Sequence, residues 1–349
     1  MAGPVMGNAQ RWQRACTWAN RATQALHTGV LGHVWQTKHR LGSWIRMGSI
    51  YLPNPAMNQN LPPTLDPKAA TRWAWCAPAQ SPWLHEEVAR RMSERLQWIK
   101  LQPQTWAHWE AVRGGLAGHG LVENQYPKAR SHVVELSPAH QALARMKLGD
   151  PWWNPSRWGD KATVFGVPAP DSMQMLWSNM SLHMQKDPQA LIRHWHQILA
   201  KDGFLMFSCL GPDTLKELRA LYAAMGWPAP AHDLTDMHDL GDMLVEAGFA
   251  EPVMDVERIA LTYETPARLL AELRELGRNL HINRFAGLRT PRWRARLEEV
   301  LPSMGAGSAM SLSFEVIYGH AVKPAPRVAV EKESAVSLDT MRSMLRQGR

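Results

Sequence analysis

The clearest pattern in the chain is an alternation of short apolar runs with longer amphipathic stretches. An apolar run at Ser172–Asn179 predicts a buried parallel strand, and Phe204–Cys209 predicts the next one. Between them, Ala190–Leu199 has helical spacing and is followed by Lys201-Asp202-Gly203, a helix stop signal. Strands that alternate with helices predict an α/β fold with a doubly wound, mostly parallel sheet.

The same alternation continues to residue 322. Asp213 or Thr214 is expected to cap a helix, and acids at Asp236 and Asp239 begin another that stops at Gly248. Helices are also expected at Arg268–Leu280 and Arg292–Leu301, and alternation over Ser311–Val322 predicts the last strand.

The first half is organised similarly. Ser81 is expected to cap a helix that has Pro82 at its first position. Thr105–Gly115 and residues 130–138 have the layout of strand, glycine turn, helix and second strand. Residues 152–166, with three Trp and one Pro, are expected to form a loop.

Charge divides the 349 residues into three parts. Residues 1–66 are expected to be a basic extension, 67–323 one α/β domain and 324–349 a disordered tail. Residues 1–65 carry six cations and no acid, and the chain from Lys323 carries six cations and three acids. The remaining 27 cations and 28 acids make the body nearly neutral despite the net charge of +8, so nucleic-acid binding is not expected.

Residues 1–56 are basic like a transit peptide, but translation from Met57 is the favoured interpretation.

Cysteine and histidine usage excludes several classes of site. Three cysteines without CxxC spacing argue against a disulfide framework or a zinc site and fit a reducing, cytoplasmic location. The chain has no run of about 18 apolar residues, so no membrane span is expected. Two pairs of possible metal ligands lie two positions apart on predicted helices, namely His194 with His196 and Asp236 with His238. Residues at this spacing do not face the same ion, so no metal is expected.

Four segments together resemble one family. They are LGPDTLKELR at 210–219, DMHDLGDML at 236–244, AGFAEPVMD at 247–255 and EVIYGHA at 315–321. Their wording resembles the malonyl-acyl carrier protein O-methyltransferases of biotin synthesis, over roughly residues 69–324. The resemblance implies the Rossmann-like doubly wound sheet of class I methyltransferases, mostly parallel with an antiparallel last strand. It also implies S-adenosyl-L-methionine as cofactor and a malonyl-carrying acyl carrier protein as partner.

The resemblance assigns the cofactor turn to the end of the first strand. Laid on the family pattern, the strand-end acid falls at His108 and the three glycines fall at Glu110, Val112 and Gly114, so only the third is kept. Glu and Val add bulk where the cofactor would pass, and a β-branched residue resists a positive φ. Gly114 and Gly115 are the residues expected to form the turn.

Further site residues follow from the resemblance. It implies that Glu135 accepts hydrogen bonds from the cofactor ribose and that Ser178 and Asn179 line the methyl-transfer site. It places the substrate beside four residues, namely Arg219, Arg274, Asn279 and Arg284. No catalytic acid or base is expected, because a malonyl carboxylate is already ionised at neutral pH.

Two functions remain open. The first is an S-adenosylmethionine-dependent O-methyltransferase that masks a free carboxylate as a methyl ester. The second is a catalytically inactive relative that keeps the fold and binds an acyl carrier or another protein. The glycine-poor turn favours the second, and the preserved wording around Glu135 and Asn279 favours the first.

Overall fold

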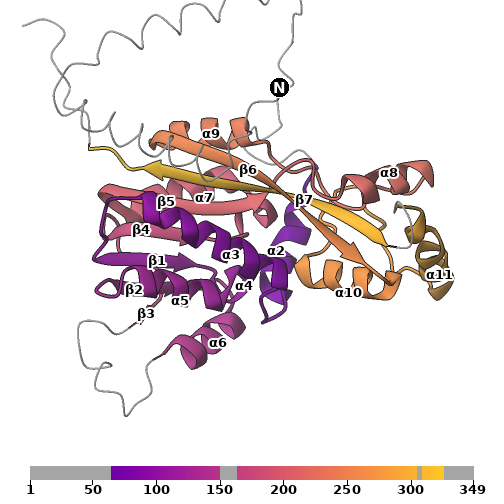
Figure 1. Ribbon diagram of the computed structural model, residues 1–349, viewed down its shortest axis with the longest axis horizontal. Helices are drawn as coiled ribbons and strands as arrows, with labels where there is room; N and C mark the ends of the chain where they lie inside the picture. Colours follow the sequence, from indigo (N-terminus) through magenta and orange to yellow (C-terminus); the bar gives the residue numbers. More distant parts are fainter. Residues whose placement is uncertain (1–63, 150–162, 305–308, 326–349) are drawn as a thin grey trace, which may run out of the picture.

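The computed structural model describes residues 64–149, 163–304 and 309–325 (Figure 1). The predicted tail and most of the predicted extension and of the 152–166 loop lie outside these residues. Within them, Leu65 and Ala70 pack against Leu280, and the amide of Asp66 donates to the Leu280 carbonyl at 2.8 Å. The division of the chain at residues 66 and 323 stays a prediction.

Seven strands form one sheet in the described residues, in the order β3-β2-β1-β4-β5-β7-β6. Strands β1 to β5 pair in parallel, and β7 runs antiparallel to both β5 and β6. The predicted, mostly parallel sheet with an antiparallel last strand is confirmed. The strands are β1 (Thr105–Trp109), β2 (Arg130–Val134), β3 (Val164–Phe165), β4 (Met173–Ser178), β5 (Leu199–Leu210), β6 (Ala250–Tyr263) and β7 (Met310–Val322).

Helices lie on both faces of the sheet. They are α2 (Pro67–Cys76), α3 (Trp83–Arg95), α4 (Ala111–Gly114), α5 (Leu116–Gln125), α6 (Pro138–Leu148), α7 (Pro188–Ile198), α8 (Lys216–Ala224), α9 (Met237–Glu246), α10 (Pro266–Leu276) and α11 (Pro291–Val300), with 3-10 turns at Leu96–Trp98, Leu182–Met184 and Leu301–Met304. Figure 1 shows α8, α10 and α11 gathered around the ends of β6 and β7 that project beyond the parallel strands.

The period-2 pattern of the strands divides the core into two layers. Trp106 of β1 and Trp177 of β4 face α3 and α5, whereas Ala107 and Leu176 face α7 and α9. Trp106, Trp177 and Trp195 are fully buried. Truncating any one of them to Ala would cost about 3–5 kcal/mol of stability.

Several predicted element ends are wrong, and at Ser81 and Thr214 the reason is that a tertiary partner takes the capping hydroxyl. The Ser81 hydroxyl donates to the Arg113 carbonyl at 3.3 Å instead of capping α3, for which Pro82 is the N-cap. The hydroxyl of Thr214 donates to the Glu315 carbonyl, and α8 starts after Leu215 without a side-chain cap. Residues 199–203, predicted as helix end and stop, already belong to β5.

The predicted ends of α9 are confirmed. The Asp236 carboxylate accepts from the amide of His238 at 2.8 Å, and Gly248 follows the helix with a φ of 99°. The predicted helix at Arg268–Leu280 is shorter, because α10 ends at Leu276.

Candidate functional site

The turn after β1 has the conformation of a glycine turn without its first two glycines. Glu110 adopts a φ of 53°, and Gly115 a φ of 119°. Because a left-handed φ costs a non-glycine residue about 1 kcal/mol or more, Glu110 is held there by its surroundings. A Cβ on Gly114 would lie 3.0 Å from the Asn179 carbonyl oxygen, so a larger residue would push the turn away from β4.

Val112 does not obstruct the turn, contrary to the sequence expectation. It lies within α4 and is fully buried in a small apolar cluster with Val133 and Ala144. The residue therefore needs no positive φ, and its side chain packs behind the turn. Of the two substitutions, only Glu110 takes the conformation that favours glycine.

Glu135 follows β2 and faces the turn. One carboxylate oxygen, Oε1, accepts from the amide of Val112 at 2.7 Å, whereas Oε2 is buried without a hydrogen-bond partner among the described residues and lies 3.8 Å from His140 Nδ1. Burial raises the pKa of this carboxyl to about 8, with the Val112 hydrogen bond opposing the rise and the neighbouring Glu110 adding to it. A buried carboxylate oxygen without a hydrogen-bond donor is rare, and a ligand hydroxyl that donates to Oε2 would satisfy it.

Two further carboxyl groups meet the same turn. The Gln185 side-chain amide donates to Glu110 Oε2 at 3.2 Å, and burial raises the pKa of Glu110 to about 7 despite the nearby Arg113. Glu86 Oε2 lies 2.7 Å from where a Cβ of Gly115 would stand and has no hydrogen-bond partner among the described residues. Three carboxyl groups around one turn favour a ligand that carries positive charge.

Of the two predicted residues at the end of β4, Asn179 holds the turn in place. Asn179 is fully buried; its amide donates to the His85 carbonyl at 2.8 Å and to the Gly114 carbonyl, and its oxygen accepts from the Ser208 hydroxyl at 2.6 Å. Ser178 exchanges a 2.7 Å hydrogen bond with Ser181. The structure thus brings Gly114 and Asn179 together and ties both to α3.

His108 occupies the position of the expected strand-end acid. Its ring is completely buried, stacks on His119 with an interplanar angle of 6°, and shares a 3.2 Å Nδ1···Nδ1 hydrogen bond with it. Burial holds the pKa of His108 well below its usual value, and the neighbouring His119 adds to this effect. The residue is therefore neutral and supplies no charge.

Most of the predicted substrate residues are engaged inside the protein. Arg219 donates to the His232 carbonyl at 2.7 Å, Arg284 pairs with Asp66 at 2.7 Å, and the Asn279 amide donates to the Ala229 carbonyl at 2.7 Å. These contacts fix loops around the site. Arg274 is exposed, and its predicted role, like that of the other three, stays a prediction.

Arg113 is a residue of this site that the sequence analysis missed. Its guanidinium donates to the carbonyls of Gln80 at 2.7 Å and Glu275 at 2.8 Å and lies over the Trp73 ring. Three segments far apart in sequence are thereby joined to the turn. The one sequence feature that pointed to this residue was the position of an arginine inside the expected glycine turn.

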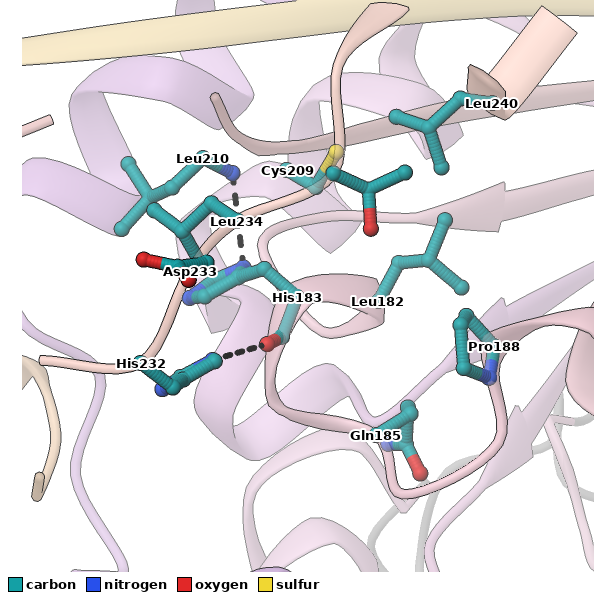
Figure 2. A pocket seen from close by; sticks show the side chains of 11 residues that line it. Leu182, His183, Gln185, Pro188, Cys209, Leu210, His232, Asp233, Leu234 and Leu240 are labelled. Carbon is teal, nitrogen blue, oxygen red and sulfur yellow. Dashed lines mark hydrogen bonds between the residues drawn. The ribbon is translucent and has the colours of Figure 1, made fainter. Parts of the chain in front are cut away.

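A small hollow lies beyond the carboxyl ends of β4 and β5 (Figure 2). His232 Nε2 donates to the His183 carbonyl at 2.9 Å, and burial holds the pKa of His183 well below its usual value. Burial also raises the pKa of the Cys209 thiol to about 12, so this cysteine is no nucleophile. The hollow has room for about one water molecule and is too small for a nucleoside.

The described residues contain neither a metal-binding cluster nor a membrane-spanning helix. In residues 64–149, 163–304 and 309–325, no three His, Cys, Asp or Glu side chains are arranged to hold a metal ion. In that same part of the chain, no helix is long and apolar enough to cross a membrane.

The sheet order and the carboxylate after β2 facing a turn after β1 define a Rossmann-like class I methyltransferase fold. Two curated relatives are malonyl-[acyl-carrier protein] O-methyltransferases. That of Gallionella capsiferriformans is 40% identical over 273 residues, 75% of this chain and 92% of its own. That of Laribacter hongkongensis is 36% identical over 252 residues, 70% of this chain and 84% of its own. The chain belongs to the malonyl-[acyl-carrier protein] O-methyltransferase family.

Other comparisons add less. No family model matches the chain. Among solved structures, Haemonchus contortus phosphoethanolamine N-methyltransferase 2 in complex with S-adenosyl-L-methionine aligns with a TM-score of 0.39 at 15% identity, over 73% of this chain and 56% of its own. A likeness at this level carries no functional argument.

Proposed function

We propose that the protein is a working S-adenosylmethionine-dependent methyltransferase that esterifies the free carboxylate of a malonyl group carried by acyl carrier protein, in biotin synthesis. Among the observations on the site, the one that carries the proposal is the unpartnered Oε2 of Glu135, a buried acceptor beside the turn after β1. Family membership supplies the substrate, since the relatives bear that name. The proposed location is the cytoplasm, where the free thiols of Cys76 and Cys209 would persist.

The residues present fit the cofactor. Glu135 would accept from the ribose hydroxyls, and the carboxyl groups of Glu86 and Glu110 would face a ligand that carries a sulfonium and an ammonium group. Gly114 and Gly115 keep the backbone of the turn free of side chains, and Val112 packs away from it. S-adenosylmethionine, when bound, supplies an electrophilic methyl group.

The protein's own task is to hold the malonyl carboxylate in line with that methyl group and to exclude water. The carboxylate is ionised at neutral pH, so methyl transfer to its oxygen needs no proton abstraction. Arg274 is a proposed contact for the incoming substrate, while Asn279 and Arg284 keep the neighbouring loop in position. Ser178 and Asn179 position the turn at the transfer site.

The second candidate is an inactive relative that retains only protein binding. The observation in its favour is that the position of the first glycine holds Glu110 and that the Oε1 of Glu135 is already used by Val112. Identity of 40% to a named O-methyltransferase over three quarters of the chain favours the enzyme.

Calorimetric titration of S-adenosylmethionine and of its demethylated product into folded protein separates the two candidates. We expect saturable one-to-one binding, followed by methyl ester formation on malonyl-acyl carrier protein, detected by intact mass spectrometry. Absence of binding in a sample that shows a cooperative unfolding transition would refute the enzyme and leave the binding protein.

A further inference from the structure

The segment between α10 and α11 exposes apolar side chains beside unpaired arginines. Ile282 is 59% exposed, Phe285 48% and Leu288 96%. The guanidinium of Arg289 lies 4.0 Å from the centre of the Phe285 ring and 4.3 Å from that of Trp293. Scattered exposed apolar residues are ordinary, but three within seven residues form a patch.

The charge of this region is one-sided. Residues 276–297 contain six arginines and no acid. Three of them pair with carboxylates elsewhere, namely Arg284 with Asp66, Arg294 with Glu298 and Arg296 with Glu299. For Arg278, Arg289 and Arg292, no carboxylate of the described residues lies within ion-pair distance. Arg274 lowers the pKa of Arg278 beyond the effect of burial, which reflects mutual repulsion of the cations.

The patch begins where α10 meets the cofactor turn. The carbonyls of Glu275 and Leu276, at the end of α10, accept from Arg113 of the turn at 2.8 and 3.2 Å. Arg113 and Arg278 both lie over the ring of Trp73. In Figure 1, α10 accordingly lies between α2 and α11. A partner seated on this patch would therefore be next to the site of methyl transfer.

We propose that Arg278, Arg289 and Arg292, with Phe285 and Leu288, form the docking surface for the acidic face of the acyl carrier protein that delivers the substrate. The inference rests on the proposed function. Guanidinium groups that have no carboxylate partner among the described residues pair with carboxylates of the carrier, and the apolar side chains pack against it. Charge complementarity of this kind sets the orientation and the association rate of the complex.

The test compares a large and a small substrate in the full-length chain. The variant Arg289→Glu/Arg292→Glu reverses two charges of the patch. The control Arg193→Glu/Lys201→Glu makes the same charge change at exposed positions of α7 and β5. We expect the first variant to raise KM for malonyl-acyl carrier protein about tenfold, with kcat within about twofold. Activity with malonyl-pantetheine, which lacks the carrier, stays unchanged, as does the control on both substrates.

Leu288→Ser supplies a second, uncharged test, because a side chain exposed to 96% cannot be needed for folding. It too is expected to raise KM for the carrier substrate alone. The docking surface is refuted if both variants keep the wild-type KM, or if activity with malonyl-pantetheine falls equally.

Failure of the proposed function would be recognised separately. If wild-type protein methylates neither substrate, fluorescence anisotropy with labelled holo-acyl carrier protein decides the docking question. Binding that weakens in Arg289→Glu/Arg292→Glu and at higher salt, but not in the control, supports the surface. Unchanged binding, or tighter binding to a DNA duplex than to the carrier, overturns it.

Discussion

Replacing Glu110 by Gln tests the electrostatics of the cofactor turn. The substitution keeps the shape of the side chain and its contact with Gln185 but removes the ionisable group. Burial raises the pKa of Glu110 from 4.5 to about 7 in the folded protein. A raised carboxyl pKa stabilises the fold fully below the unfolded value, and this contribution is lost as the pH rises through the folded value.

The magnitude follows from the size of the shift. A pKa change of one unit corresponds to about 1.4 kcal/mol, so Glu110 alone withdraws about 3 kcal/mol of stability between about pH 4.5 and pH 7 or above. We therefore expect Glu110→Gln to match wild type near pH 4 and to exceed it by about 3 kcal/mol near pH 8. Removal of one charge also lowers the pKa of Glu135, which adds to the gain.

Urea unfolding of wild type and variant at several pH values measures this difference. The control is Glu264→Gln, at an exposed carboxylate that follows β6. Parallel pH profiles for wild type and Glu110→Gln would refute the reasoning and show that Glu110 is ionised at little cost. A gain of equal size in the control would place the effect in net charge instead of burial.

Three further predictions concern the same region and the core. Asn179→Ala leaves the carbonyls of His85 and Gly114 without a donor and should cost about 2–4 kcal/mol in urea unfolding, whereas an unchanged midpoint would contradict the network. Gly319→Ala places a Cβ 2.2 Å from the Phe207 ring and should lower stability by about 1–3 kcal/mol, with partial rescue by Phe207→Leu. S-adenosylmethionine binding should release protons near pH 7, because a cationic ligand lowers the raised pKa values of Glu110 and Glu135. Calorimetry in buffers of different ionisation enthalpy measures that release, and equal heats in all buffers would contradict it.

The fold could be predicted from the sequence because its signals are local. The apolar run of β4 and the acid and glycine at the ends of α9 carry their meaning within a few residues. The same locality explains the wrong predictions. Thr214 is a suitable cap by composition, but Glu315, 101 residues away, takes its hydroxyl.

The site was less accessible to sequence reasoning. Glu135 and Gly114 followed from a resemblance, and the structure brings the turn and the carboxylate together. Arg284 was singled out as a substrate contact, a role that stays a prediction, and its pairing with Asp66, 218 residues earlier, could not be read from the local sequence. The joint position of Glu86, Glu110 and Glu135 depends on three separate segments, and no local pattern predicts such a meeting.

The sheet order separates the proposed carrier-docking segment from the cofactor turn along the chain. The segments α10 and α11 form one excursion between the neighbouring antiparallel strands β6 and β7, whereas the cofactor turn lies between β1 and β2. Each of the two connections begins and ends on a pair of neighbouring strands. Residues 264–309 can therefore be exchanged as a block without altering the strands around the turn. Transplanting that block between family members should transfer preference for a carrier protein while leaving affinity for the methyl donor with the recipient.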